Sequence, residues 1–128
     1  IDAPRLLTPD LSLRSHPRIR IAGQLSGTEG YLEAIATGLL AALGVYAVRG
    51  ELPPLKLPST TALGALLAYA TDPATDDYQP MHVNFGLVPP LAERVRGKRA
   101  RYEAYALRAR ADMTACVSAR PDLLTVGV

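Results

Sequence analysis

The sequence predicts an α/β fold in which one short strand and one buried helix are followed by a mainly helical extension. Charged and β-branched residues alternate over residues 18–22, which is typical of a short strand. Gly23, Gly27 and Gly30 follow, and a stretch rich in Ala, Leu and Gly then runs over residues 31–48. A strand, a glycine-containing turn and an apolar helix in this order are suited to binding an anionic cofactor.

Composition is compatible with one domain in a reducing compartment. The chain has 128 residues, 48% of them hydrophobic, and a net charge of +2, which is too small to indicate a polyanionic partner by itself. The single cysteine excludes an intrachain disulfide framework, and no signal-peptide pattern is seen, so we expect a cytoplasmic protein. The apolar uncharged stretch 34–48 is shorter than the roughly 20 residues of a membrane span, so we expect no membrane partner. Because the chain begins at Ile1 and not at Met, we interpret it as the C-terminal part of a longer protein.

The first elements follow from local patterns. Residues 1–17 contain three prolines and little periodicity, which predicts an extended connector. In the strand that follows, Ile19 and Ile21 share one face. The glycines then allow positive φ angles or a close approach to a ligand. The helix expected over 30–48 has apolar residues on nearly every side, so it should be largely buried, and its N-terminal N–H groups favour a negative charge.

A linker and a second helix are expected next. Pro53, Pro54 and Pro58 predict an extended linker. Residues 59–61 offer hydroxyl groups that can cap the N-terminus of a short apolar helix over 62–70.

The remaining residues are expected to end in a long helix. Residues 71–77 are interpreted as an acidic loop, and 78–87 as a short strand or an extended segment. Residues 91–117 are interpreted as a long amphipathic helix that carries most of the basic side chains. We therefore divide the chain into residues 1–50, with the connector, strand, glycine turn and first helix, and residues 51–128, with the proline-rich linker and the helical extension.

Four motifs resemble those of a known family. Residues 23–33 (GQLSGTEGYLE) resemble the last flavin-contacting motif shared by folate- and FAD-dependent tRNA uracil-5-methyltransferases, the TrmFO family, and by the related GidA-type enzymes. Residues 60–67 (TTALGALL), 79–91 (QPMHVNFGLVPPL) and 98–103 (KRARYE) resemble the methyltransferase family. The likeness extends over residues 1–110. His82 stands where the family pattern has Asn.

The resemblance implies the C-terminal part of a Rossmann-like FAD-binding domain in an enzyme that forms 5-methyluridine in the tRNA T loop. Methylenetetrahydrofolate would be the one-carbon donor, FAD the cofactor and NAD(P)H the reductant. Uracil C5 becomes nucleophilic only after a thiolate adds at C6. Neither that thiolate nor a Gly-x-Gly-x-x-Gly fingerprint is evident here, so both are expected in a missing N-terminal portion. Cys116 is expected to be an inert thiol, and this chain alone is expected to contain no catalytic residue and to be inactive.

Expected cofactor contacts lie in the glycine-containing turn. The resemblance assigns them to Gly23, Gln24, Gly30, Tyr31 and Leu32. Gln24 would bond the cofactor through its side chain, and the backbone at residues 30–32 would face the flavin edge where reduction places negative charge. Alternatively, the glycines form only a tight turn, and the tyrosine is either a stacking partner of pterin or flavin or an ordinary interfacial residue.

Other candidate contacts lie further along the chain. Asn84 is expected to contact the folate together with Tyr31, whereas Glu29, Glu33 and His82 are assigned structural roles, the two acids as partners of the helix dipole. No metal site is expected. Basic side chains near the last helix would either bind tRNA phosphates or form a solvated helix face. These residues are Arg94, Arg96, Lys98, Arg99 and Arg101.

Two other functions remain open. One is a GidA-like flavoprotein that modifies the tRNA wobble uridine. The other is a non-catalytic remnant of a broken gene that binds tRNA or has a structural role. A Gly-x-Gly-x-x-Gly strand, turn and helix encoded upstream would argue against the remnant.

Overall fold

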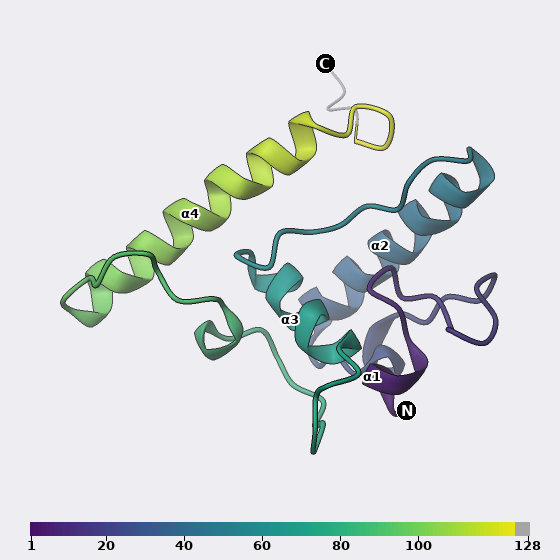
Figure 1. Cartoon of the computed structure of the whole chain (residues 1–128), viewed down its shortest axis with the longest axis horizontal. Coiled ribbons are helices and arrows are strands. Elements are labelled where there is room, and N and C mark those ends of the chain that lie inside the picture. Colours follow the sequence, from purple (N-terminus) through teal and green to yellow (C-terminus); the bar gives the residue numbers. More distant parts are fainter. Residues whose placement is uncertain (125–128) are drawn as a thin grey trace.

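A computed structural model describes residues 1–124 of the chain, and this part is mainly helical (Figure 1). Helices α1, α2 and α3 gather on one side of the molecule, whereas α4 lies apart from them along the opposite side. The elements in order are α1 (Ala3–Leu6), the 3-10 turn η1 (Gly23–Ser26), α2 (Tyr31–Arg49), α3 (Ala62–Thr71), the 3-10 turn η2 (Phe85–Leu87) and α4 (Lys98–Ser118).

The expected strand over residues 18–22 is not formed, and residues 1–124 contain no sheet. Arg20 makes one isolated antiparallel bridge with Ser12, and backbone hydrogen bonds join 11–13 to 19–21. A strand needs a partner of similar length to satisfy its N–H and C=O groups. Here the partner is only about three residues long, so the α/β expectation reduces to a helical chain with a short paired loop.

Helix α2 has the predicted position but not the predicted burial. It begins after Gly30, whose φ of 115° favours glycine, and it ends at Arg49. The described elements cover only one side of it, so the expectation of a largely buried helix is wrong for this chain. The buried residues of α2 are Glu33, Thr37, Gly44 and Ala47.

Helix α2 also has the length and apolar composition of a membrane-crossing helix. Its most apolar 18-residue window has a mean hydropathy of 1.6, and 22% of that window is buried. Core helices of soluble proteins can have the same length and apolar composition, so one such helix is weak evidence and does not by itself place the chain in a membrane.

The core joins the N-terminal segment to α3. Ala3, Leu7, Leu11 and Leu67 form a cluster of buried apolar side chains. Helix α3 begins where the sequence predicts, because the Thr61 hydroxyl caps it by accepting a hydrogen bond from the Gly64 N–H at 3.1 Å. Apolar burial in this cluster therefore holds α1 and α3 together.

Helix α4 is shorter than predicted. Gly97 has a φ of 89° and precedes the first helical residue, Lys98, so the helix cannot extend back to residue 91. Residues 91–97 are irregular, and Arg94 and Arg96 therefore lie outside the helix. No residue of α4 is buried.

Candidate functional site

The glycine turn, residues 23–30, is held together by side-chain hydroxyls. The backbone N–H of Gly23 donates to Thr37 Oγ1 on α2 at 2.8 Å. The Gly23 carbonyl accepts from Ser26 Oγ at 2.7 Å and from Thr28 Oγ1 at 3.2 Å. All three hydroxyl-bearing residues are buried. The turn is thus fixed to the helix that follows it.

A distant segment, residues 78–83, lies along the same turn. The Tyr78 hydroxyl donates to the Gly27 carbonyl at 2.7 Å, and burial is the main cause that raises the pKa of Tyr78 to about 12. Gly27 has a φ of 83°, and a Cβ there would lie only 1.6 Å from the tyrosine oxygen. The Glu29 N–H donates to the Met81 carbonyl at 3.1 Å. Glycine at position 27 therefore makes this contact possible.

Glu33 makes the third link between the turn and this segment. Its side chain is 9% exposed, and its Oε1 accepts from the Val83 N–H at 3.1 Å. That hydrogen bond is the main cause that lowers the pKa of Glu33, assisted by its own backbone N–H and opposed by burial. A Cβ at Gly30 would lie 2.1 Å from Glu33 Oε2. From the sequence, this acid was expected only to interact with the helix dipole, and its partner 50 residues away was missed.

His82 lies between two carboxylates. Its Nε2 is 3.8 Å from Glu29 Oε2, and its Nδ1 is 3.9 Å from Glu33 Oε1. The ring is 66% exposed, so its contacts with the two carboxylates are open to water on the histidine side and contribute little energy. The histidine therefore has a structural position at the rim of the turn.

The start of α2 is available to a ligand. The helix has no side-chain N-cap, and Tyr31 and Leu32 are 93% and 79% exposed. Gln24 is also exposed, and its side chain has no hydrogen-bond partner within residues 1–124. Free N–H groups at a helix start bind negatively charged or carbonyl oxygens. The residues of this turn therefore fit the polar edge of a flavin.

Asn84 lies on an apolar groove of about 330 Å³, which Phe85 and Tyr105 also line. Its Oδ1 accepts from the Gly86 N–H at 2.9 Å, and its Nδ2 donates to the His82 carbonyl at 3.1 Å. The amide therefore caps η2, and contact with a folate stays a prediction for both Asn84 and Tyr31.

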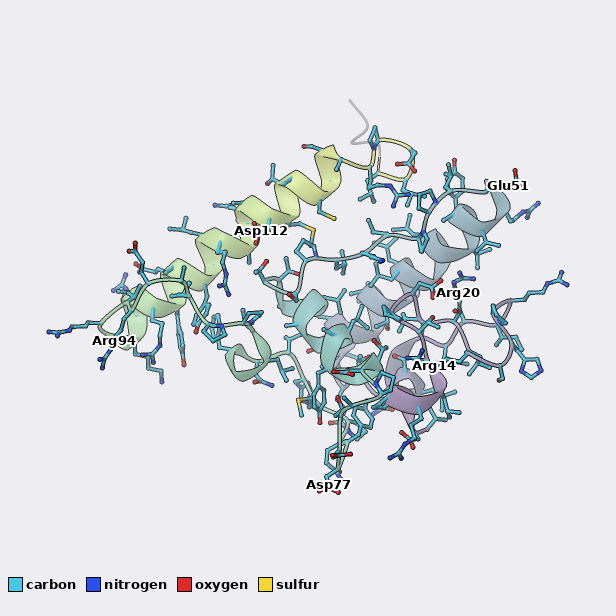
Figure 2. All side chains as sticks on the ribbon, viewed as in Figure 1. Arg14, Arg20, Glu51, Asp77, Arg94 and Asp112 are labelled. Atoms are coloured by element: carbon cyan, nitrogen blue, oxygen red, sulfur yellow. The ribbon has the colours of Figure 1, made fainter. Side chains whose placement is uncertain are left out.

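The five basic residues assigned to tRNA are all exposed. Figure 2 shows Arg94 projecting away from the rest of the chain. Arg99 pairs with Glu103 at 3.0 Å, and such an exposed pair leaves the cation accessible. We call Arg94, Arg96, Lys98, Arg99 and Arg101 the basic cluster.

The tyrosines of α4 anchor the helix. The Tyr102 ring stacks on Phe85 with centroids 4.3 Å apart, and Lys98 Nζ lies 5.6 Å from the centre of the same ring. Tyr105 stacks on Phe85 as well, at 5.6 Å. These rings are engaged within the chain, so they do not form an open platform for bases.

Comparisons with known proteins identify the family. Residues 1–50 match the family model described as Glucose inhibited division protein A. The chain is 45% identical over 109 residues to TrmFO of Thermotoga neapolitana, which is named methylenetetrahydrofolate–tRNA-(uracil-5-)-methyltransferase, and this alignment covers 85% of the chain. The chain belongs to the TrmFO family, which is related to GidA.

Other TrmFO proteins show similar identity. The chain is 49% identical to the Moorella thermoacetica protein over 112 residues and 42% identical to that of Synechococcus sp. strain CC9605 over 125 residues. These alignments cover 85% and 98% of the chain, but only 25% and 27% of the two relatives. The chain spans about a quarter of the length of the curated relatives that it matches.

The structure brings together two of the TrmFO-like motifs. Residues 23–33 and 79–91 meet through the bridge between Thr28 and Met81 and through the Glu33 carboxylate. The basic cluster lies on a separate part of the chain, at the start of α4 and in the loop before it. This TrmFO-family chain therefore has two separate surfaces, a glycine turn and a cationic end.

Proposed function

We propose that the chain is part of a flavoprotein tRNA methyltransferase that uses methylenetetrahydrofolate and FAD to form 5-methyluridine in the T loop. Curated relatives that are 42–49% identical carry the methylenetetrahydrofolate–tRNA methyltransferase name. The observation that carries the flavin assignment is the uncapped start of α2 beside the glycine turn. We place the protein in the cytoplasm and take NAD(P)H as its reductant.

The glycine turn would orient the flavin. The N–H groups of Tyr31 and Leu32 and the positive end of the α2 dipole would stabilise negative charge on the flavin edge, and Gln24 would donate from its exposed side chain. When bound and reduced by NAD(P)H, the flavin would supply the electrons that reduce the transferred one-carbon unit to a methyl group. The ring of Tyr31, which is 93% exposed, would stack on the flavin or on the folate pterin, with Asn84 at the folate. Gly23, with a φ of 68°, would allow the backbone to approach the cofactor closely, whereas the space beside Gly30 is taken by Glu33 and His82.

The exposed face of α2 fits a contact with the rest of the protein. Apolar side chains that are 59–79% exposed recur at helical spacing along it. Soluble monomers rarely leave a continuous apolar stripe in water. We propose that the missing N-terminal portion, with the dinucleotide fingerprint and the thiolate, covers this stripe and supplies strands to pair with 18–22. The apolar stripe comprises Leu32, Ile35, Leu39 and Tyr46.

The basic cluster would bind tRNA phosphates. Phosphate contacts release counterions, so the binding constant should fall steeply with salt. Replacing Arg96 and Arg101 with glutamine should weaken binding at low salt and reduce the salt dependence by about two counterions. Filter binding of unmodified tRNA at several salt concentrations measures both quantities. Arg120→Gln is the control and should leave tRNA binding unchanged, because the Arg120 guanidinium is already bound to Asp122 at 2.7 Å and to the Pro53 carbonyl at 2.7 Å.

Nucleoside analysis tests the proposed activity directly. The full-length protein should form 5-methyluridine in tRNA that lacks it, and only when FAD, methylenetetrahydrofolate and NAD(P)H are all present. Mass spectrometry of the digested tRNA detects the product. Modification at the wobble uridine instead would support the GidA-like alternative, and no modification would support the non-catalytic remnant.

A matched pair of glutamine variants tests the flavin contact. Gln24→Ala in the full-length protein should lower FAD retention after gel filtration, because the proposed side-chain bond to the cofactor is lost. Gln79→Ala changes the other glutamine of the chain, which is exposed and outside the turn, and should retain FAD normally. Equal flavin content in the two variants would reject the assignment of Gln24.

A further inference from the structure

A buried carboxylate links two motifs that lie 50 residues apart. Glu33 belongs to the first turn of α2, where acids usually remain exposed and favour the helix dipole. Here the residue is only 7% exposed, and its Oε1 accepts a hydrogen bond from the Val83 N–H. The acid therefore holds a backbone group of another segment.

The local packing leaves the carboxylate little freedom to move. A Cβ at Gly30 would lie 2.1 Å from Glu33 Oε2 and 3.0 Å from His82 Nδ1. Glycine at position 30 thus provides the space in which the carboxylate and the imidazole lie side by side. The same glycine precedes the exposed start of α2. The carboxylate and the proposed flavin-binding N–H groups therefore share one turn of helix.

Val83 is the last of three attachment points along its segment. Tyr78 is bound to Gly27, and Met81 is bound to Glu29, both within the glycine turn. Directly after Val83, Asn84 caps η2 and lines the apolar groove. The bond between Glu33 and Val83 is therefore the attachment of this segment that lies nearest to the groove along the chain.

We propose that Glu33 is a positioning residue that fastens residues 81–84 to the glycine turn, so that a cofactor ordering the turn also orders the wall of the neighbouring groove. This inference rests on the proposed flavin site and adds a coupling between it and the motif at residues 79–91. Glu33 acts through Val83 and is assigned no contact with the flavin or the substrate.

Hydrogen exchange in the full-length protein without FAD tests the attachment. Glu33→Ala should speed exchange at the Val83 amide by about tenfold or more, since a hydrogen bond to a charged group is lost. Glu33→Gln keeps an acceptor oxygen and should show a smaller increase. Glu29→Ala is the control, because that carboxylate faces the same His82 but bonds no backbone group of the segment. Unchanged exchange at Val83 in Glu33→Ala would overturn the proposal, and so would an increase that extends equally through α3.

Addition of FAD tests the coupling. FAD should slow exchange over residues 81–84 in the wild type and in Glu33→Gln, and it should leave Glu33→Ala unchanged there. Equal slowing in Glu33→Ala would overturn the positioning role. If the wild type binds no FAD, the proposed function and the coupling both fail, whereas exchange at Val83 without FAD still decides whether Glu33 holds the segment.

Discussion

Replacing Gly27 with alanine should destabilise the chain by about 2–3 kcal/mol. Gly27 has a φ of 83°, a conformation that L side chains rarely adopt. A Cβ at this position would lie 1.6 Å from the Tyr78 oxygen and 2.7 Å from its Cζ. The tyrosine must therefore move, and its hydrogen bond to the Gly27 carbonyl is lost. The variant should thus separate residues 78–83 from the glycine turn.

Two contributions make up this magnitude. The left-handed conformation of a residue with a Cβ costs about 1–2 kcal/mol. Loss of the hydrogen bond adds about 1 kcal/mol, because the tyrosine is only partly buried. Gly38→Ala is the matched control, since that glycine is in a regular part of α2 and a Cβ there meets nothing within 4 Å. In the isolated chain it should stabilise the fold by up to about 1 kcal/mol, because alanine favours helix.

Urea unfolding followed by circular dichroism measures these free energies, and a double-mutant cycle isolates the clash. In a Tyr78→Ala background, Gly27→Ala should retain only the conformational cost of about 1–2 kcal/mol. An equal loss of unfolding free energy for Gly27→Ala in both backgrounds would contradict the clash with Tyr78, and so would a loss no greater than that of Gly38→Ala.

Three further predictions concern stability and packing. Burial alone would raise the pKa of Asp10, but hydrogen bonds from Thr8, Ser12 and Arg20 hold this pKa below the ordinary 3.8. The stability that the ionised carboxylate contributes is therefore complete above pH 3.8 and is lost as the pH falls below it. Acid unfolding should accordingly show a smaller loss of stability in Asp10→Asn than in the wild type. Phe85→Leu removes two ring contacts with α4 and should lower the stability by about 1 kcal/mol. Relative to the wild type, hydrogen exchange should then speed up more in α4 than in α3. Ile35→Glu on the apolar stripe should lower the melting temperature of the full-length protein by several degrees, because it places a charge in the proposed interface. The control Leu107→Glu, at a similarly exposed apolar position on α4, should change the melting temperature little. Equal effects of the two variants would argue against the interface.

Local signals predicted α2 and α3 well, whereas α1 lies within residues 1–17, where an extended connector was expected. Gly30 and Gly50 bracket α2, and the Thr61 hydroxyl caps α3; each is a short-range effect that can be recognised in the sequence. The start of α4 was predicted too early because the amphipathic helix was expected to extend back to residue 91, whereas Gly97 adopts a positive φ. A single glycine is compatible with several conformations, so its effect becomes clear only in the structure.

Burial and distant contacts were the least predictable. The pattern of α2 indicates an apolar helix but not what covers it, and the described residues leave the apolar stripe exposed. The prediction of a strand over 18–22 was wrong for a similar reason, because a strand forms only when another extended segment pairs with it. At the site, the sequence identified the glycine turn, but the bond between Glu33 and Val83 joins residues whose spacing has no local signature.

Flavin content tests the central claim, that this chain forms one wall of a site completed by the rest of the protein. The full-length protein and the 128-residue chain should be purified in parallel, and their absorbance near 450 nm compared with their protein concentration. We predict stoichiometric FAD on the full-length protein and none on the chain alone. Stoichiometric FAD on the chain alone, or none on the full-length protein after incubation with FAD, would contradict the account.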